Sequence, residues 1–305
     1  MPEVRIPAFA KINLRLEILG KRPDGYHELR TIFQTVSLHD ELKLKRTKNP
    51  GITLRVTGNA ALSGEPVEKN LVYRAVQALR TELQDEGGVE VELKKKIPAG
   101  RGLGGGSSDA AAAMIGYLRL TSKKLETERL MAIGAALGAD VPFFLQGGRA
   151  LGIGRGDEIY PLPDIATKTV LIVSPSNIHV PTPDAYRWLN APELTKSVET
   201  PKLFKFCALA WSMQGTGLLN DFEGAVFEHY PRLSEIKRDL LQKGATEALL
   251  AGSGSAVIGI FPSPAKARRA AVGFPLDETF VCETLSRAKY LRLTYGRAGK
   301  GARSA

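Results

Sequence analysis

Cysteine and histidine are scarce in this sequence of 305 residues, and long apolar runs are absent from it. The two cysteines, Cys207 and Cys282, are far apart without a C-x-x-C pair, and the four histidines are scattered. This pattern argues against a disulfide framework and against a zinc site. No apolar run reaches the roughly 18 residues of a membrane span, and the start, with Glu3, lacks the apolar core of a signal peptide. We therefore expect a cytoplasmic protein without a membrane partner.

Acidic residues are missing from the C-terminal end, although the whole chain carries a net charge of +10. Residues 287–305 contain no acid and six basic residues, which are Arg287, Lys289, Arg292, Arg297, Lys300 and Arg303. The final stretch, GRAGKGARSA, is rich in glycine and lacks large apolar residues, so we expect it to be disordered. The rest of the chain is then only mildly basic, which suits a protein that binds polyphosphate ligands. Nucleic acid is not the expected partner; a weak RNA-binding role for the tail is the alternative.

Glycine, in contrast, is abundant and clusters in residues 98–114, PAGRGLGGGSSDAAAAM. Its glycines allow positive φ angles and leave no Cβ to block a ligand. Alternating apolar and polar residues over 89–97 predict a strand before this loop, and the small residues after it predict a helix. The first turn of such a helix attracts phosphate through its N–H groups and its dipole. We therefore expect the loop to bind an anionic ligand.

Three interpretations of this loop can be compared with its sequence. A Walker loop is excluded, because Gly106 is followed by Ser107 and Ser108 and not by the required lysine. A dinucleotide fingerprint is formally present, but it requires a second strand and an acid about 20 residues later. The sequence has instead a break at 121–124 and a second helical pattern at 125–138. A plain glycine turn is the third interpretation.

The remaining pattern indicates an α+β protein of two domains, since 305 residues exceed what one core usually organises. Strands are predicted at 10–19, 27–38 and 40–47, a strand with a hairpin at 149–164, and a buried strand at 169–173. A helix is predicted over 70–83, with Asn70 as its N-cap. We expect an N-terminal domain over 1–160, a C-terminal domain over 161–290 and the basic tail over 291–305.

The glycine loop resembles the nucleotide loop of the GHMP small-molecule kinases, which bind ATP without a Walker lysine. Residues 7–42 resemble the opening of one branch of that superfamily, the 4-diphosphocytidyl-2-C-methyl-D-erythritol kinases. Further matches occur in the family's order, with LGADVPFFL at 137–145, VPTPDAY at 180–186 and LAGSGSAVIG at 250–259. The resemblance covers nearly the whole chain. It implies the two-domain GHMP kinase fold, with an S5-like N-terminal domain and a ferredoxin-like C-terminal domain.

The same resemblance implies an ATP-dependent kinase that phosphorylates the 2-hydroxyl of its cytidine diphosphate substrate, in the non-mevalonate route to isoprenoid precursors. Phosphoryl transfer also calls for Mg²⁺, which neutralises charge on the β- and γ-phosphates. The alternatives are another GHMP kinase, of the mevalonate or homoserine type, and a nucleotide-binding protein without catalysis. The adjacent Tyr26 and His27, together with PTPDAY, favour the first interpretation.

Two candidate catalytic residues follow from the resemblance. Asp140 matches the family's catalytic aspartate, which takes the proton of the acceptor hydroxyl, and Lys11 matches the lysine beside it. Asn13 projects from the same strand face as Lys11 and matches a substrate contact. Without the resemblance, Asp140 would be a helix or turn cap before Pro142, and Lys11 and Asn13 would form a solvated strand face.

Substrate-binding residues are also implied by the resemblance. Tyr26 and His27 match the pair that stacks on and reads the cytosine, and Tyr186 matches the second stacking aromatic, where the family also has Phe. Thr182 matches a substrate contact in the same loop. Taken alone, Tyr26 would be a packing residue.

The ATP-binding residues implied by the resemblance are Asn70, Lys95, Pro98, Ala99, Gly100, Arg101, Gly102, Leu103, Gly104, Gly105, Gly106, Ser107 and Ser108. Lys94 or Lys96 is the alternative to Lys95. Either Ser107 or Ser108 is a candidate magnesium ligand, and Asp109 is a further possibility, but the sequence identifies no complete ligand set. Gly252, Ser253 and Gly254 are expected to shape the cleft at the domain interface.

Overall fold

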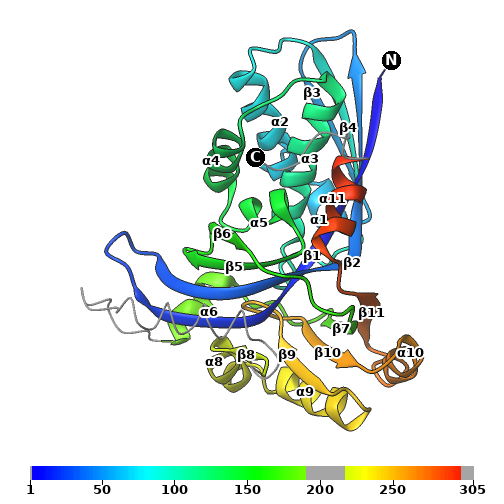
Figure 1. Cartoon of the computed structure of the whole chain (residues 1–305). Helices are drawn as coiled ribbons and strands as arrows, with labels where there is room; N and C mark the ends of the chain where they lie inside the picture. The colour runs from blue at the N-terminus through cyan, green and yellow to red at the C-terminus, as the bar shows by residue number, and fades with distance from the viewer. Residues whose placement is uncertain (1, 190–216, 297–305) are drawn as a thin grey trace.

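Two β-sheets organise the chain, one of seven strands and one of four (Figure 1). The computed structural model describes residues 2–189 and 217–296; Cys207 and residues 297–305 of the expected tail lie outside them. The first sheet contains β1 (Glu3–Lys21), β2 (His27–Thr47), β3 (Ile52–Thr57), β4 (Gly88–Lys94), β5 (Arg149–Gly154), β6 (Glu158–Pro161) and β8 (Leu219–Asn220). The second contains β7 (Thr169–Pro175), β9 (Glu247–Leu250), β10 (Val257–Phe261) and β11 (Asp277–Glu283).

Helices pack on both sheets, which confirms the α+β prediction. They are α1 (Ala60–Ser63), the short 3₁₀ helix η1 (Val67–Lys69), α2 (Leu71–Glu82), α3 (Gly105–Thr121), α4 (Thr127–Leu137), α5 (Val141–Gln146), α6 (Thr182–Leu189), α8 (Phe222–His229), α9 (Pro231–Gln242), α10 (Pro264–Ala271) and α11 (Arg287–Tyr295). Asn70 caps α2 as predicted, because its side chain accepts a hydrogen bond from the Val72 N–H at 2.9 Å. No helix of the described residues is both long enough and apolar enough to cross a membrane.

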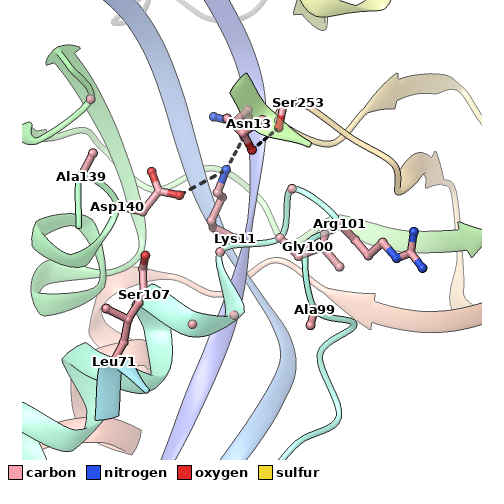
Figure 2. Close-up of a pocket in the computed structure, with 18 of the residues that line it drawn as sticks. Lys11, Asn13, Leu71, Ala99, Gly100, Arg101, Ser107, Ala139, Asp140 and Ser253 are labelled. Carbon is pink, nitrogen blue, oxygen red and sulfur yellow. Dashed lines mark hydrogen bonds and ion pairs between the residues drawn. The ribbon is translucent and has the colours of Figure 1, made fainter. Parts of the chain in front are cut away.

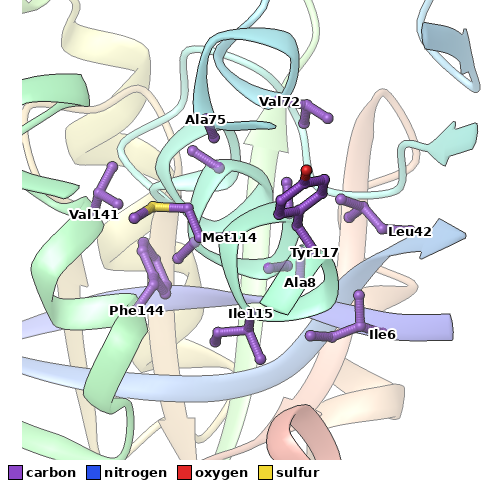
Figure 3. Packing of buried hydrophobic residues seen from close by; sticks show 14 of the residues in the cluster. Ile6, Ala8, Leu42, Val72, Ala75, Met114, Ile115, Tyr117, Val141 and Phe144 are labelled. Atoms are coloured by element: carbon purple, nitrogen blue, oxygen red, sulfur yellow. The ribbon is translucent and has the colours of Figure 1, made fainter. Parts of the chain in front are cut away.

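Helix α3, which follows the glycine loop, is the centre of the first core (Figure 3). Its residues Ala110 to Ala113 are buried, and their small side chains let α3 pack closely against α2, β1 and β2. Met114 and Ile115 fill the space around this contact, and the buried Tyr117 donates a hydrogen bond to Asp85 at 2.6 Å. The helix that begins at the loop is therefore held by packing on several sides, so its amino end has a defined position.

Strand β2 is one continuous strand, and not the two strands expected at 27–38 and 40–47. Its first half pairs with β5 and its second half pairs with β4, so the strand runs through without a turn. The register against β1 shifts between Phe9 and Lys11, where the pairing changes. Asp40, near this shift, is fully buried and accepts hydrogen bonds from the backbone N–H groups of Lys96 and Ile97. A buried carboxylate with backbone partners explains why this polar position does not end the strand.

The second sheet has the order β11-β7-β10-β9 and is antiparallel throughout. Along the chain its elements follow as strand, helices, two strands, helix and strand, which is the ferredoxin-like βαββαβ arrangement. The ferredoxin-like prediction for the C-terminal part is therefore confirmed. All residues of β7 and β10 are buried, as expected for the two central strands.

Two segments after residue 160 pack on the first sheet. The expected division into an N-terminal domain over 1–160 and a C-terminal domain from 161 therefore does not separate the two sheets completely. Strand β8 pairs in parallel with β1, and α11 packs on α3 and β1. The expected tail at 291–305 also needs correction, because 291–295 belong to α11. Tyr290 is buried against Phe9 and donates a hydrogen bond to the Phe144 carbonyl, while Tyr295 donates to the Leu145 carbonyl at 2.7 Å. The basic residues of this stretch obscured the aromatic residues that anchor it.

Replacing Tyr290 with alanine tests this anchor. We expect Tyr290→Ala to lower the free energy of unfolding by about 3 kcal/mol, because it leaves a cavity between α11 and the first core. Leu293→Ala is the control, since Leu293 on the same helix is 40% exposed and should cost less than about 1 kcal/mol. Urea unfolding of both variants measures the difference, and equal losses would contradict the docking of α11.

Candidate active site

A cleft of about 1160 Å³ contains the predicted site. The glycine loop, β1, β2, the start of α5 and the start of α6 all contribute to its walls. The predicted residues that line it are Lys11, Asn13, Tyr26, His27, Asn70, Lys95, the loop from Pro98 to Ser107, Asp140, Thr182 and Tyr186. Gly252 and Ser253 also line it, whereas Ser108 and Gly254 are predicted residues that the cleft does not include.

Lys11 and Asp140 face each other in this cleft (Figure 2). The Lys11 Nζ atom is 3.6 Å from Asp140 Oδ2, and the exposed fractions of the two side chains are 6% and 30%. Asp140 stands at the start of α5, but its carboxylate makes no capping hydrogen bond there. Asp140 does occupy the N-cap position of α5, as the alternative from the sequence had it, but without a side-chain capping bond. Lys11 and Asn13 are buried, so they do not form a solvated strand face. The carboxylate is available to a ligand in the cleft.

A short hydrogen-bond chain orients Asn13 beside Lys11. Lys11 Nζ donates to Asn13 Oδ1 at 2.8 Å, and Asn13 Nδ2 donates to Thr31 Oγ1 at 2.6 Å. Thr31 in turn donates to the Arg15 carbonyl at 2.8 Å. Thr31 therefore fixes which face of the Asn13 amide meets Lys11, a role that sequence reasoning missed. The signal is the β1–β2 register, which places Thr31 and Phe33 opposite this part of β1.

The glycine loop is held by one backbone hydrogen bond and by close packing at two of its glycines. The Lys11 N–H donates to the Leu103 carbonyl at 3.0 Å, which ties the loop to β1. Gly104 has a φ of 71°, and a Cβ there would come within 2.8 Å of the Phe144 ring. A Cβ on Gly102 would overlap the Ala251 carbonyl oxygen. Only glycine fits these two positions, and the loop so placed delivers the amino end of α3, with Ser107, to the cleft.

Ser108 and Lys95, both predicted to bind ATP, form hydrogen bonds or ion pairs within the protein. Ser108 is buried and its hydroxyl donates to the Phe9 carbonyl at 2.6 Å, so it supports the loop from behind instead of facing a nucleotide. Lys95 borders the cleft, but its ammonium is bonded to Asp40 at 2.5 Å and to Asp109 at 2.6 Å. The charge of Lys95 is therefore already matched within the protein.

These three groups form a buried cluster beneath the loop. Burial raises the pKa of Asp109 well above its usual value, even though the Lys95 ammonium opposes that shift. For Lys95, burial alone would lower the pKa, but the charges of Asp109 and Asp40 raise it overall. Asp109 Oδ1 is buried and has no hydrogen-bond partner. We conclude that Lys95 stays charged while Asp109 resists ionisation, and that neither is positioned as a solvent-facing ligand.

Aromatic side chains gather at the end of the cleft near the β1–β2 turn. The rings of His27 and Tyr186 stack with centroids 4.5 Å apart, and Phe222 meets Tyr186 edge-on at 4.9 Å. Tyr26 is 56% exposed, and the guanidinium of Arg155 lies 5.0 Å from its ring centroid. Tyr26 is therefore not a core packing residue, and Arg155 is a cleft residue that the sequence did not indicate.

The electrostatics of this aromatic end favour neutral side chains. Burial, with the charge of Lys21, lowers the pKa of His27, so its ring is neutral at pH 7 and offers one donor and one acceptor. Burial, with the charge of Asp140, raises the pKa of Tyr186 to about 12. Thr182 lies 3.0 Å from Ser253, hydroxyl to hydroxyl, so α6 and the third glycine-rich segment meet here.

Comparisons with known proteins show the family of this chain. The models of the GHMP kinase N-terminal and C-terminal domains match residues 70–148 and 205–275. The 4-diphosphocytidyl-2-C-methyl-D-erythritol kinase of Solibacter usitatus is 44% identical over 94% of this chain and 90% of its own length. The kinase of the same name from Moorella thermoacetica is 40% identical over 92% of this chain and 97% of its own length. This chain belongs to the 4-diphosphocytidyl-2-C-methyl-D-erythritol kinase family.

Solved structures place the family within a wider group of folds. A crystal structure of 4-(cytidine 5'-diphospho)-2C-methyl-D-erythritol kinase has a TM-score of 0.75 and 32% identity, over 92% of this chain and 99% of that one. Homoserine kinase from Cytophaga hutchinsonii has a TM-score of 0.66 at 21% identity, covers 94% and 95% of the two chains, and shows the shared fold alone. The chain is thus a small-molecule kinase with the two-domain GHMP kinase fold, as the motifs predicted.

Stability at different pH values tests the buried cluster. The folded chain keeps a proton on Asp109 at pH values where an unfolded carboxyl, with a pKa of about 3.9, has lost it. Stability from this group is therefore present below about pH 4 and is lost as the pH rises toward the raised folded pKa. The free energy of unfolding of wild type should therefore fall between pH 5 and pH 8. We expect this fall to be smaller in Asp109→Asn, by at least about 1 kcal/mol.

Asp40→Asn tests the second carboxyl group of the same cluster. It keeps an amide oxygen that can accept from the Lys96 and Ile97 N–H groups, but it removes the negative charge beside the Lys95 ammonium and leaves Lys95 with one carboxyl group. We expect it to destabilise the chain by about 3 kcal/mol at pH 8, and to weaken the pH dependence that comes from Asp109, because the charge of Asp40 helps to raise the pKa of Asp109. Parallel pH profiles for Asp109→Asn and wild type, measured by urea unfolding, would contradict the raised pKa of Asp109.

Proposed function

We propose that this chain transfers the γ-phosphoryl group of ATP to the 2-hydroxyl of 4-diphosphocytidyl-2-C-methyl-D-erythritol, in the non-mevalonate (methylerythritol phosphate) pathway to isoprenoid precursors. The observation that carries this proposal is the position of the Lys11–Asp140 pair. It lies in one cleft with the glycine loop at α3 and with the aromatic groups around His27 and Tyr186. The pair can therefore meet a phosphate from one side and an alcohol from the other. The proposed use of ATP by this chain agrees with the cytoplasmic location that we expect.

The glycine loop and α3 are the proposed site of the ATP phosphates. The amino end of a 17-residue helix opens into the cleft there, and its dipole favours negative charge. Asn70 and Leu71 border the same cleft at the start of α2, on the side proposed for adenine. The side chain of Lys95 contributes to this site through the buried cluster, because its ammonium is bonded to two carboxyl groups.

Magnesium is proposed to bind with ATP, and the residues present fit it. Of the three candidates from the sequence, Ser107 and Asp109 line the cleft, but Asp109 is buried and bonded to Lys95, and the Ser108 hydroxyl is bonded to the Phe9 carbonyl. Ser107 is therefore the accessible oxygen among them. One protein oxygen suits an ion that is held mainly by phosphates and water. When bound, magnesium would neutralise charge on the β- and γ-phosphates.

Asp140 is the proposed general base. Its carboxylate accepts the proton of the 2-hydroxyl as the oxygen attacks the γ-phosphorus and the bond to the β-phosphate oxygen breaks, which releases ADP. Lys11, 3.6 Å from Asp140 and almost buried, places a positive charge where the alkoxide develops. Asn13, held by Thr31, orients the Lys11 ammonium and offers the hydroxyl a polar neighbour.

The cytosine is proposed to bind among Tyr26, His27 and Tyr186. Aromatic faces hold a flat base by stacking, and the neutral His27 ring can pair with its edge. Thr182 lies beside Ser253 at the same end of the cleft. This recognition of a cytidine diphosphate group separates the proposal from the mevalonate and homoserine alternatives. The position of Lys11 beside Asp140 weighs against a protein that only binds nucleotide.

A coupled assay of ADP release tests the proposal. The full chain is incubated with ATP, Mg²⁺ and, separately, 4-diphosphocytidyl-2-C-methyl-D-erythritol, mevalonate and homoserine. We expect turnover with the first alcohol, with one phosphoryl group added to it by mass spectrometry. Turnover with only mevalonate or homoserine would move the chain to another branch of the superfamily. Nucleotide binding with no turnover would favour the non-catalytic alternative.

Asp140→Asn tests the base. Loss of the proton acceptor should lower kcat by roughly 10²- to 10⁴-fold and leave KM for ATP nearly unchanged. Asp184→Asn is a matched control, because the Asp184 side chain is 32% exposed, close to the 30% of Asp140, and pairs with Arg187 on α6. Steady-state kinetics compare the two variants, and near-normal turnover of Asp140→Asn would remove Asp140 as the base.

A further inference from the structure

Arg101 is the one charged residue in the glycine loop over 98–108. A cation in a nucleotide loop would ordinarily be taken as a phosphate ligand. Figure 2 shows its side chain running away from Lys11, Asp140 and Ser107, along the loop toward the second sheet. Its direction therefore calls for another role.

The guanidinium of Arg101 is bonded to the second part of the chain. Arg101 Nη1 donates to Ser255 Oγ at 2.8 Å, and Nη2 donates to the Ser176 carbonyl at 3.1 Å. Ser255 is fully buried and its hydroxyl donates to the Ile178 carbonyl at 2.6 Å. The planar fork of arginine thus joins the glycine loop to two segments, the one after β7 and the one between β9 and β10.

Backbone contacts reinforce the same junction. The Ala256 N–H donates to the Arg101 carbonyl at 3.2 Å. A Cβ on Gly102 would come within 1.8 Å of the Ala251 carbonyl oxygen, and a Cβ on Gly100 would come within 2.7 Å of the His179 ring. Arg101 and both of its flanking glycines therefore rest on the second sheet's loops, whereas Leu103 rests on β1.

We infer that Arg101 is a positioning residue that clamps the glycine loop to the second domain before nucleotide binds. The inference rests on the proposed function, in which this loop cradles the ATP phosphates. A glycine-rich backbone loses much conformational entropy when it is ordered. A loop that the clamp has already ordered loses less on binding, so affinity rises without any contact between the clamp and the phosphates.

Two variants, Arg101→Met and Arg101→Lys, test the clamp. Isothermal titration calorimetry measures their affinity for the β,γ-imido analogue of ATP and for ADP. We expect both variants to bind both nucleotides about fivefold more weakly, an effect of the size of one net hydrogen bond. The lysine variant should not recover affinity, since an ammonium cannot form the forked pair. Arg268→Met, which removes an exposed arginine from α10, should bind like wild type.

Ser255→Ala extends the test to the partner of the clamp. Alone it should weaken both nucleotides by a similar factor, and the double variant Arg101→Met/Ser255→Ala should lose less than the two single losses combined. Thermal unfolding confirms that each variant is folded. If Ser255→Ala does not fold, the two Arg101 variants still decide the inference.

Two results would overturn the inference. The first is that Arg101→Lys recovers wild-type affinity, while Arg101→Met loses more affinity for the ATP analogue than for ADP. Arg101 would then be a phosphate ligand. Wild-type affinity in both Arg101 variants would show that the contact has no part in binding. Failure of the wild-type chain to bind either nucleotide would instead refute the proposed function itself, so the two failures can be told apart.

Discussion

The close packing of the glycine loop against its neighbours is the constraint on which the rest of the site depends. At Gly102 and Gly104 the backbone comes so close to Ala251 and Phe144 that no side chain fits. Lys11 takes part twice, because its N–H holds the Leu103 carbonyl while its ammonium faces Asp140. The phosphate cradle and the proposed reacting pair are therefore parts of one frame, and a shift of the loop would displace both.

Two buried lysines near this loop show how the surroundings of a charge determine its role. Lys95 makes short contacts with the carboxyl groups of Asp40 and Asp109, so its charge is matched inside the protein. Lys11 bonds to the neutral amide of Asn13 and is 3.6 Å from Asp140. Its charge is less completely compensated, which suits a group that meets developing negative charge. The same residue type thus supports the fold in one place and faces the cleft in the other.

Much of the fold and of the site follows from local pattern. Lys11 and Asn13 share a face because a strand has period two, Asn70 caps α2, and the glycines before a small-residue helix mark an anion site. The sequence did not reveal that β2 would be continuous, since it predicted two separate strands at 27–38 and 40–47. It also hid α11, because the basic residues around Tyr290 resemble a disordered tail. Thr31, Arg155 and the inward-facing Ser108 depend on strand register and loop direction, which no single segment encodes.

The sequence by itself determined the family, the α+β class, the loop and the candidate residues, because each of these rests on a contiguous motif or on a short-range period. Only the tertiary structure decided which candidates face the cleft and which are bonded behind it. Ser107 and Ser108 are neighbours in sequence, yet one lines the cleft and the other is tied to Phe9. The reason is that burial and charge pairing depend on residues far away in the chain. Asp40 beside Lys95 and Ser255 beside Arg101 come together only when the sheets and their loops are assembled.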